Sequence, residues 1–188
     1  LRSVLGLEAK NPAIVLADSD IDLAVNECLL GSLSYNGQRC TALKIIFVHE
    51  SVAEEFNRKM TAAVNSLISG MPWDANVQVT PLPEAGKTEY LGALVNDAVE
   101  KGARILNADG GKFDHTFFTP ALLYPVTREM RIWQEEQFGP VVPIVPFREI
   151  SEPLDYVTAS NYGQQLSIFG RNPDDIAHLI DPLVNQVC

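Results

Sequence analysis

Basic residues are scarce in this sequence. The 188 residues contain 14 lysines and arginines against 24 aspartates and glutamates, so the formal net charge at pH 7 is −10. An acidic surface of this kind repels both nucleic acid and anionic lipid headgroups. The charge balance therefore argues against nucleic acid and membrane as main partners, and a small molecule is the expected ligand.

Long apolar runs and cysteines are also few. The longest apolar run, residues 43–48, contains Lys44 and is far shorter than the roughly 20 residues that a membrane-spanning helix needs. The three cysteines, Cys28, Cys40 and Cys188, have neither metal-ligand spacing nor the even number of a disulfide framework. These absences predict a chain without a metal site or membrane span in a reducing compartment, with the cytosol as the expected one.

Several common motifs are missing as well. The sequence has no internal repeat, no Gly-x-Gly-x-x-Gly pattern and no signal-like segment, and it does not begin with methionine. The Gly-rich residues 109–112 lack the strand, loop and helix context of a phosphate-binding loop and are expected to form a turn. We expect a single domain that is part of a longer chain.

The sequence does contain an alternation of helical and strand-like segments. Capping residues and apolar positions three or four apart predict helices over residues 18–33, 51–67, 87–101, 152–159 and 174–181. Runs of β-branched and other apolar residues predict strands over residues 41–48, 103–106, 117–123, 141–147 and 167–170. This order predicts an α/β fold, with a mostly parallel sheet covered by helices on both faces.

One thiol stands in a loop that suits chemistry. Residues 34–41 read Ser-Tyr-Asn-Gly-Gln-Arg-Cys-Thr and join a predicted helix to a predicted buried strand. The cation of Arg39 would favour a charged sulfur on Cys40, and the glycine-containing loop could aim backbone N–H groups at a substrate oxygen. The alternative is a buried structural cysteine, since free cysteine is among the most buried residue types.

The segment Gly-Gln-Arg-Cys-Thr at residues 37–41 resembles the active-site cysteine motif of the aldehyde dehydrogenase superfamily. Further segments resemble other landmarks of that family and follow the same order, at residues 10–20, 117–120, 130–132, 135–141 and 160–163. The sequence is therefore identified as a member of the superfamily. The resemblance implies that residues 1–188 are the thiol-bearing catalytic domain. The resemblance also implies that the upstream dinucleotide-binding domain and the C-terminal oligomerisation strand of the family lie outside residues 1–188.

The resemblance implies a mechanism and roles for individual residues. Cys40 would attack the aldehyde carbon to give a thiohemiacetal, hydride would pass to the nicotinamide, and water would hydrolyse the resulting thioester. In the family a glutamate, here Glu136, holds the nicotinamide ribose, and a phenylalanine, here Phe138, packs near the nicotinamide. A carboxylate suits ribose hydroxyls because it accepts two hydrogen bonds. Without the resemblance, Glu136 is an ordinary solvated acid and Phe138 a core residue.

The general base departs from the family pattern. Family members carry it in a Leu-Glu-Leu-Gly-Gly-Lys segment, whereas alignment on Lys10 gives Leu-Gly-Leu-Glu-Ala-Lys at residues 5–10, with Gly6 at the usual base position. Glu8 lies two residues later, and a shift of two along an extended strand returns a side chain to the same face about 7 Å away. Glu8 is therefore the candidate base, and the alternative is a surface residue.

Within the superfamily, residues 38–42, 130–132 and 135–138 most resemble the non-phosphorylating, NADP-dependent glyceraldehyde-3-phosphate dehydrogenases. This implies NADP, or NAD, as the cofactor and an Arg39 that binds the substrate phosphate through two parallel hydrogen bonds. Dehydrogenases of carboxylate-bearing semialdehydes also place an arginine there, so Arg39 indicates an anionic aldehyde. The family's subunit-bridging strand implies a homo-oligomeric parent enzyme, and the 188 residues alone are expected to be inactive.

Two other classes of function remain open. A binding or structural module on the same fold is favoured by Gly6 at the base position. A cysteine hydrolase or acyltransferase would need a histidine paired to Cys40. His49 is the nearest candidate, but it ends the predicted strand that leads away from the loop. His115 and His178 are expected in a polar loop and a surface helix, without partners at metal spacing.

Overall fold

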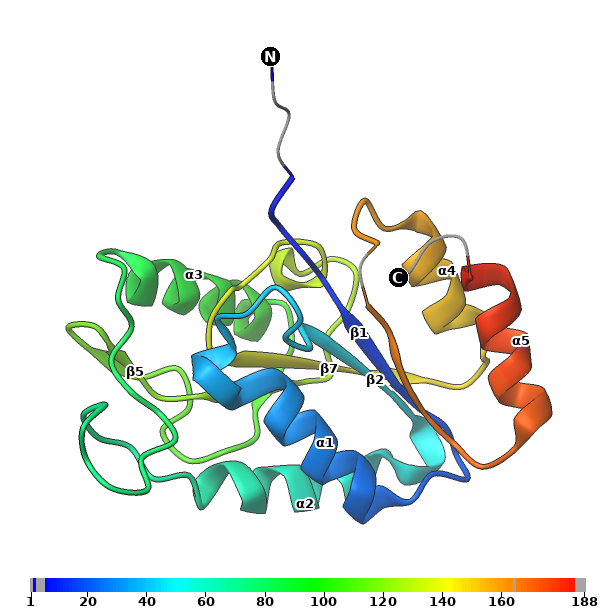
Figure 1. Cartoon of the computed structure of the whole chain (residues 1–188), viewed down its shortest axis with the longest axis horizontal. Helices are drawn as coiled ribbons and strands as arrows, with labels where there is room; N and C mark the ends of the chain where they lie inside the picture. The colour runs from blue at the N-terminus through cyan, green and yellow to red at the C-terminus, as the bar shows by residue number, and fades with distance from the viewer. Residues whose placement is uncertain (1, 3–5, 164, 185–188) are drawn as a thin grey trace.

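One six-stranded sheet between two helical layers forms the body of the protein (Figure 1). The computed structural model describes residues 2, 6–163 and 165–184, so Leu5 and Cys188 lie outside the described residues. The strand order is β3-β6-β7-β2-β1-β8, and every neighbouring pair is parallel except β3 with β6 at one edge. The predicted α/β fold with a mostly parallel sheet is confirmed.

The strands and helices alternate along the chain. The strands of the main sheet are β1 (Pro12–Val15), β2 (Ile45–His49), β3 (Arg104–Ile105), β6 (Ala121–Tyr124), β7 (Val141–Phe147) and β8 (Ser167–Phe169). A separate hairpin consists of β4 (Phe113–Asp114) and β5 (Phe117–Phe118). The helices are α1 (Ile21–Leu33), α2 (Glu50–Asn65), α3 (Lys87–Glu100), α4 (Ser151–Ala159) and α5 (Pro173–Leu183), with short 3-10 turns η1 (Ser34–Gly37) and η2 (Arg131–Trp133).

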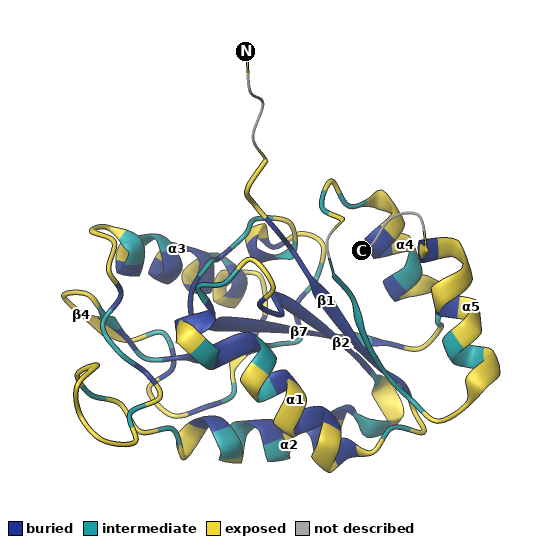
Figure 2. Cartoon of the chain, viewed as in Figure 1, coloured by how far each residue is buried: buried dark blue, intermediate teal, exposed yellow. Residues whose placement is uncertain are grey.

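Different helices cover the two faces of the sheet. On one face Ile46 of β2 belongs to the same buried cluster as Phe56 of α2, and α1 lies in that layer too. On the other face Phe47 of β2 belongs to a cluster with Leu91 of α3, which also includes α4 and α5. The central strands are therefore buried on both sides (Figure 2), which explains why β2 is a continuous apolar run.

Two predicted strand boundaries are wrong. The single strand predicted over residues 117–123 is two strands in different sheets, because Pro120 between them has no N–H for a ladder. The strand predicted from residue 41 begins only at Ile45, because residues before it still belong to the cysteine loop, where the N–H of Ala42 donates to the carbonyl oxygen of Arg39 at 3.2 Å.

No helix in the described part of the chain has the length and apolarity needed to cross a membrane.

Candidate active site

Three segments meet where parallel strands begin. Lys10 precedes β1, Cys40 precedes β2, and residues 135–140 precede β7. Because these strands are neighbours in the sheet and run in the same direction, the segments in front of them lie next to one another. The candidate site thus lies at the amino-terminal edge of the sheet, whereas open parallel sheets usually bind ligands at the carboxyl edge.

The loop before Cys40 has an unusual backbone and a close neighbour. Tyr35, Asn36 and Gly37 have φ values of 53°, 57° and 70°. A Cβ on Gly37 would lie 2.8 Å from the carbonyl oxygen of Gly139, so only glycine allows this approach. The Asn36 amide is fixed by Thr80, whose hydroxyl oxygen accepts from Nδ2 at 2.9 Å and whose N–H donates to Oδ1 at 3.0 Å. The cysteine loop is therefore docked on the loop that enters β7.

Cys40 is exposed, whereas Cys28 lies on the buried face of α1. Burial raises the pKa of the Cys28 thiol, which makes Cys28 the structural cysteine of the described pair. The Cys40 backbone is held by Asn11, whose Nδ2 donates to the carbonyl oxygens of Cys40 at 2.7 Å and Ala42 at 3.0 Å. The exposed thiol therefore sits on a firmly anchored loop.

Arg39 turns back onto the end of α1. Its Nη2 donates to the carbonyl oxygens of Leu30 at 3.3 Å and Gly31 at 3.1 Å, where a cation interacts favourably with the helix dipole. Its Nε is buried and has no hydrogen-bond partner among the described residues. Arg39 also lines a groove of about 550 Å³ between α1 and β8. The guanidinium thus caps a helix and borders this groove.

Glu136 and Phe138 lie together beside two lysines. The Nζ of Lys44 is 3.1 Å from Oε1 of Glu136, and the two side chains are 1% and 11% exposed. The Phe138 ring has Lys44 Nζ at 5.2 Å and Lys87 Nζ at 5.7 Å from its centroid. Burial lowers the pKa of Lys44, and the hydrogen bond and charge of Glu136 oppose that change. Oε1 of Glu136 is buried without a well-directed hydrogen bond from any described residue.

A second buried lysine holds the same loop. Lys10 Nζ donates to the carbonyl oxygen of Glu135 and to Oε1 of Gln137, both at 2.7 Å. Gln137 Nε2 in turn donates to the carbonyl oxygens of Lys44 and Val141, both at 2.8 Å. Burial lowers the pKa of Lys10 well below its ordinary value, and the charge of Lys44 adds to this.

Sequence-based assignment misses Lys10, Lys44 and Gln137 as parts of the site. The sequence did contain one signal, which is the position of Lys44 inside an apolar run. A lysine buried with such a strand requires polar partners from elsewhere in the chain, and these partners mark a polar site.

The sequence model of the aldehyde dehydrogenase family matches residues 1–185. The chain belongs to the aldehyde dehydrogenase family. An NADP-dependent glyceraldehyde-3-phosphate dehydrogenase from Streptococcus equinus is 39% identical over 90% of this chain and 35% of its own length. A sulfoacetaldehyde dehydrogenase from Neptuniibacter caesariensis is 31% identical over 96% of this chain and 39% of its own length.

A solved structure shows the same fold. The crystal structure of an NADP-dependent glyceraldehyde-3-phosphate dehydrogenase from Bacillus halodurans, complexed with NADP, superposes with a TM-score of 0.89 at 36% identity. The match covers 96% of this chain and 37% of that one. The chain therefore spans about a third of the length of the aldehyde dehydrogenases that it matches.

In this member of the aldehyde dehydrogenase family, Glu8 is exposed and lies near Tyr162. Burial raises the pKa of Tyr162, and the charge of Glu8 raises it further. No hydrogen bond joins Glu8 to the Cys40 loop within the described residues. A Cβ added to Gly6 would have no atom within 4 Å, so the usual base position of the family lies in open space.

The histidines lie away from the thiol of this aldehyde dehydrogenase family member. His49 ends β2, at the opposite end of the strand from Cys40. It also caps α2, because its Nδ1 accepts from the N–H of Ser51 at 3.2 Å. His115 is exposed next to Asp114, and the part of the chain that the structure describes has no group of three side chains suited to a metal ion. The hydrolase alternative thus loses its candidate partner for Cys40.

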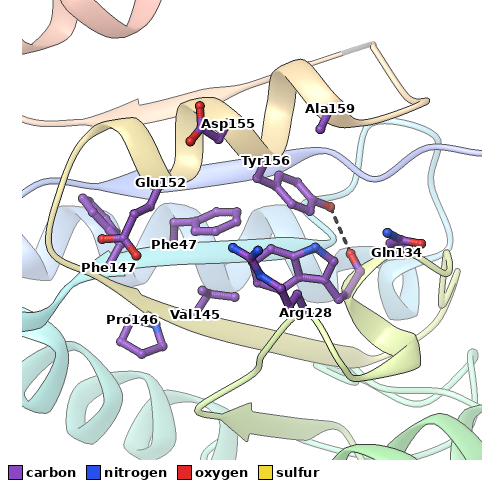
Figure 3. A pocket seen from close by; sticks show the side chains of 11 residues that line it. Phe47, Arg128, Gln134, Val145, Pro146, Phe147, Glu152, Asp155, Tyr156 and Ala159 are labelled. Carbon is purple, nitrogen blue, oxygen red and sulfur yellow. Dashed lines mark hydrogen bonds between the residues drawn. The ribbon is translucent and has the colours of Figure 1, made fainter.

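An aromatic hollow of about 380 Å³ lies between η2 and α4 (Figure 3). Phe47, Trp133 and Tyr156 line it, and the Tyr156 hydroxyl donates to the carbonyl oxygen of Trp133 at 3.2 Å. Phe47 and Tyr156 belong to the buried core beneath α4. None of the candidate site residues of this aldehyde dehydrogenase family member lines the hollow.

Proposed function

We propose that this chain supplies the nucleophile of an NADP-dependent enzyme that oxidises an aldehyde to a carboxylic acid. The observation that carries the proposal is the exposed Cys40 thiol on a loop docked against the loop of Glu136 and Phe138. The Cys40 sulfur attacks the aldehyde carbon and forms a thiohemiacetal. NADP, when bound, supplies the acceptor for the hydride that leaves that carbon. The thioester left on Cys40 is then hydrolysed by water.

Glu136 and Phe138 fit the nicotinamide end of the cofactor in this proposal. Glu136 Oε1 is paired with Lys44, which leaves the second carboxylate oxygen to accept hydrogen bonds from ribose hydroxyls. Phe138 offers an aromatic ring in the same loop as Glu136, against which the flat nicotinamide ring would pack. The names of relatives such as the Streptococcus equinus enzyme support NADP over NAD.

Two further roles in the reaction are proposed for residues of this chain. The backbone N–H of Cys40 has no hydrogen-bond acceptor among the described residues, so it can donate to the developing oxyanion of the aldehyde. Glu8 is the proposed base that takes a proton from the hydrolytic water. Because Glu8 is exposed and turned toward Tyr162, this role requires water to lie between its carboxylate and the thioester.

The aldehyde is proposed to be anionic, such as glyceraldehyde 3-phosphate or a semialdehyde that bears a carboxylate. The support is Arg39 beside the nucleophile and the similarity to a glyceraldehyde-3-phosphate dehydrogenase and a sulfoacetaldehyde dehydrogenase, whose aldehydes carry a phosphate and a sulfonate. A guanidinium binds such groups through two parallel N–H donors.

Replacement of Arg39 by leucine in the intact enzyme tests this role. We expect the KM for glyceraldehyde 3-phosphate to rise about tenfold more than the KM for a neutral aldehyde such as propanal, because one charge-assisted hydrogen bond is worth roughly 1.5–3 kcal/mol. Steady-state rates of NADPH formation measure both values. Equal changes for the two aldehydes would mean that Arg39 serves only as a cap of α1.

We also propose that residues 1–188 are the thiol-bearing catalytic domain of a longer, oligomeric polypeptide. The support is that the chain spans about a third of its relatives. The remainder would bind most of the dinucleotide and provide a second oxyanion donor.

The isolated 188 residues should therefore form no NADPH from NADP and an aldehyde, even when folding is verified by circular dichroism. Robust activity of these residues alone would contradict the proposed division of the protein.

A further inference from the structure

Lys44 contacts every segment of the proposed active site. We infer that Lys44 is a positioning residue, which orients the Glu136 carboxylate for the cofactor and couples it to the Cys40 loop. The inference rests on the proposed function, in which Glu136 holds the nicotinamide end of NADP.

The Lys44 ammonium has three partners in three directions. Its Nζ donates to the carbonyl oxygen of Arg39 at 2.7 Å, directly before the nucleophile. It pairs with Oε1 of Glu136 at 3.1 Å, and it faces the Phe138 ring at 5.2 Å from the centroid. An ammonium carries three N–H donors on a flexible stem, so one lysine can serve a carbonyl, a carboxylate and a ring face at once.

The backbone of Lys44 is fixed as firmly as its side chain. Its N–H donates to the carbonyl oxygen of Asn11 at 2.8 Å, and its carbonyl oxygen accepts from Gln137 Nε2 at 2.8 Å. These two hydrogen bonds therefore fix the main chain of Lys44 between the segment before β1 and the loop that enters β7. Since the side chain is only 1% exposed, the ammonium has little room to move.

Glu136 depends on this lysine for its orientation. Its backbone carbonyl oxygen accepts from the Tyr90 hydroxyl at 2.8 Å, which anchors the main chain but leaves the carboxylate free to rotate. Among the described residues, the one ion pair of that carboxylate is with Lys44. Lys44 thus holds one carboxylate oxygen and leaves the other to accept from ribose.

A buried lysine at this place is costly unless it has such a function. Its neighbours Leu43 and Ile45 are buried and apolar, and burial lowers the pKa of Lys44 because the charged form loses water. An apolar side chain would fill the volume without that cost. The partners that offset this desolvation cost are the Glu136 carboxylate and the Arg39 carbonyl oxygen in the cysteine loop. Both belong to the proposed active site, which argues for a role of Lys44 there.

A double-mutant cycle in the intact enzyme tests the inference through NADP binding. Lys44→Met should raise the Kd for NADP about tenfold in the wild-type background, equivalent to roughly 1.4 kcal/mol. In the Glu136→Gln background the same change should raise it less than about twofold, because the carboxylate that Lys44 orients is already gone. Equilibrium titration of NADP, followed by protein fluorescence, measures all four values. An equal factor in both backgrounds, or none in the wild type, overturns the inference.

Lys10→Met is the matched control. Lys10 is also a buried lysine that holds this loop, but its hydrogen bonds go to the Glu135 carbonyl oxygen and Gln137, not to the Glu136 carboxylate. Lys10 meets Glu136 only through a charge interaction without a hydrogen bond, so the factor by which Lys10→Met changes the Kd should differ between the two backgrounds by much less than that of Lys44→Met. If Lys44→Met fails to fold, Lys44→Gln keeps a donor for the Arg39 carbonyl oxygen and removes the charge, and the same pattern is expected of it.

Aldehyde oxidation by the wild-type enzyme is measured alongside the titrations. Coupling between Lys44 and Glu136 without aldehyde oxidation would refute the proposed function and support the positioning role. Aldehyde oxidation without coupling between Lys44 and Glu136 would support the proposed function and refute the positioning role of Lys44.

Discussion

Replacement of Cys40 by serine should abolish aldehyde oxidation in the intact enzyme, with kcat falling by about a thousandfold or more. A serine hydroxyl is a far weaker nucleophile than a thiolate unless a base activates it, and His49 lies at the other end of β2. Initial rates of NADPH formation at saturating aldehyde measure the effect. Substantial activity in the serine variant would contradict the proposed covalent step.

Cys28→Ala provides the matched control, because it removes a thiol that lies on the buried face of α1 and is closed off from solvent. Its kcat should stay within about twofold of the wild type, while the melting temperature falls through loss of packing. Labelling with a thiol reagent that mimics an aldehyde adds a direct test. Modification of Cys40 in the wild type favours the enzyme, whereas an inert Cys40 would favour the binding or structural module.

Replacement of Glu8 by glutamine should allow one round of hydride transfer and then stall. Attack by Cys40 does not need this carboxylate, but hydrolysis of the thioester needs a group that accepts a proton from water. Rapid mixing should therefore show a burst of NADPH equal to the enzyme concentration, followed by a steady-state rate about a hundredfold below the wild type. An unchanged steady-state rate would assign Glu8 to the surface.

Gly6→Glu separates loss of the base from other effects of the Glu8→Gln change. A Cβ at position 6 would meet no atom within 4 Å, so a larger residue can be introduced there without a clash at its Cβ. Because this is the usual base position in the resembling family, Gly6→Glu should restore much of the steady-state rate in the Glu8→Gln variant. Failure to restore it, with the burst intact, would place the base elsewhere in the longer polypeptide.

Local patterns predicted much of the fold. The helix predicted over residues 87–101 is observed as α3, and the strand predicted over residues 141–147 is observed as β7. Both depend on periodicity and neighbouring residues within one segment, which a sequence displays directly. The break at Pro120 was missed because the flanking residues are equally strand-like on both sides, and only their pairing shows that they enter different sheets.

The sequence by itself determined the α/β class, the family and the candidates Cys40, Arg39, Glu136 and Phe138, because each follows from the order of residue types along the chain. Only the tertiary structure decided that Cys40 is exposed and that the cysteine loop touches the loop entering β7. It likewise decided that Lys10 and Lys44 hold these segments together. The physical reason is that a buried charge is defined by its partners, and those of Lys44 lie up to 94 residues away in the chain, brought close by three parallel strands.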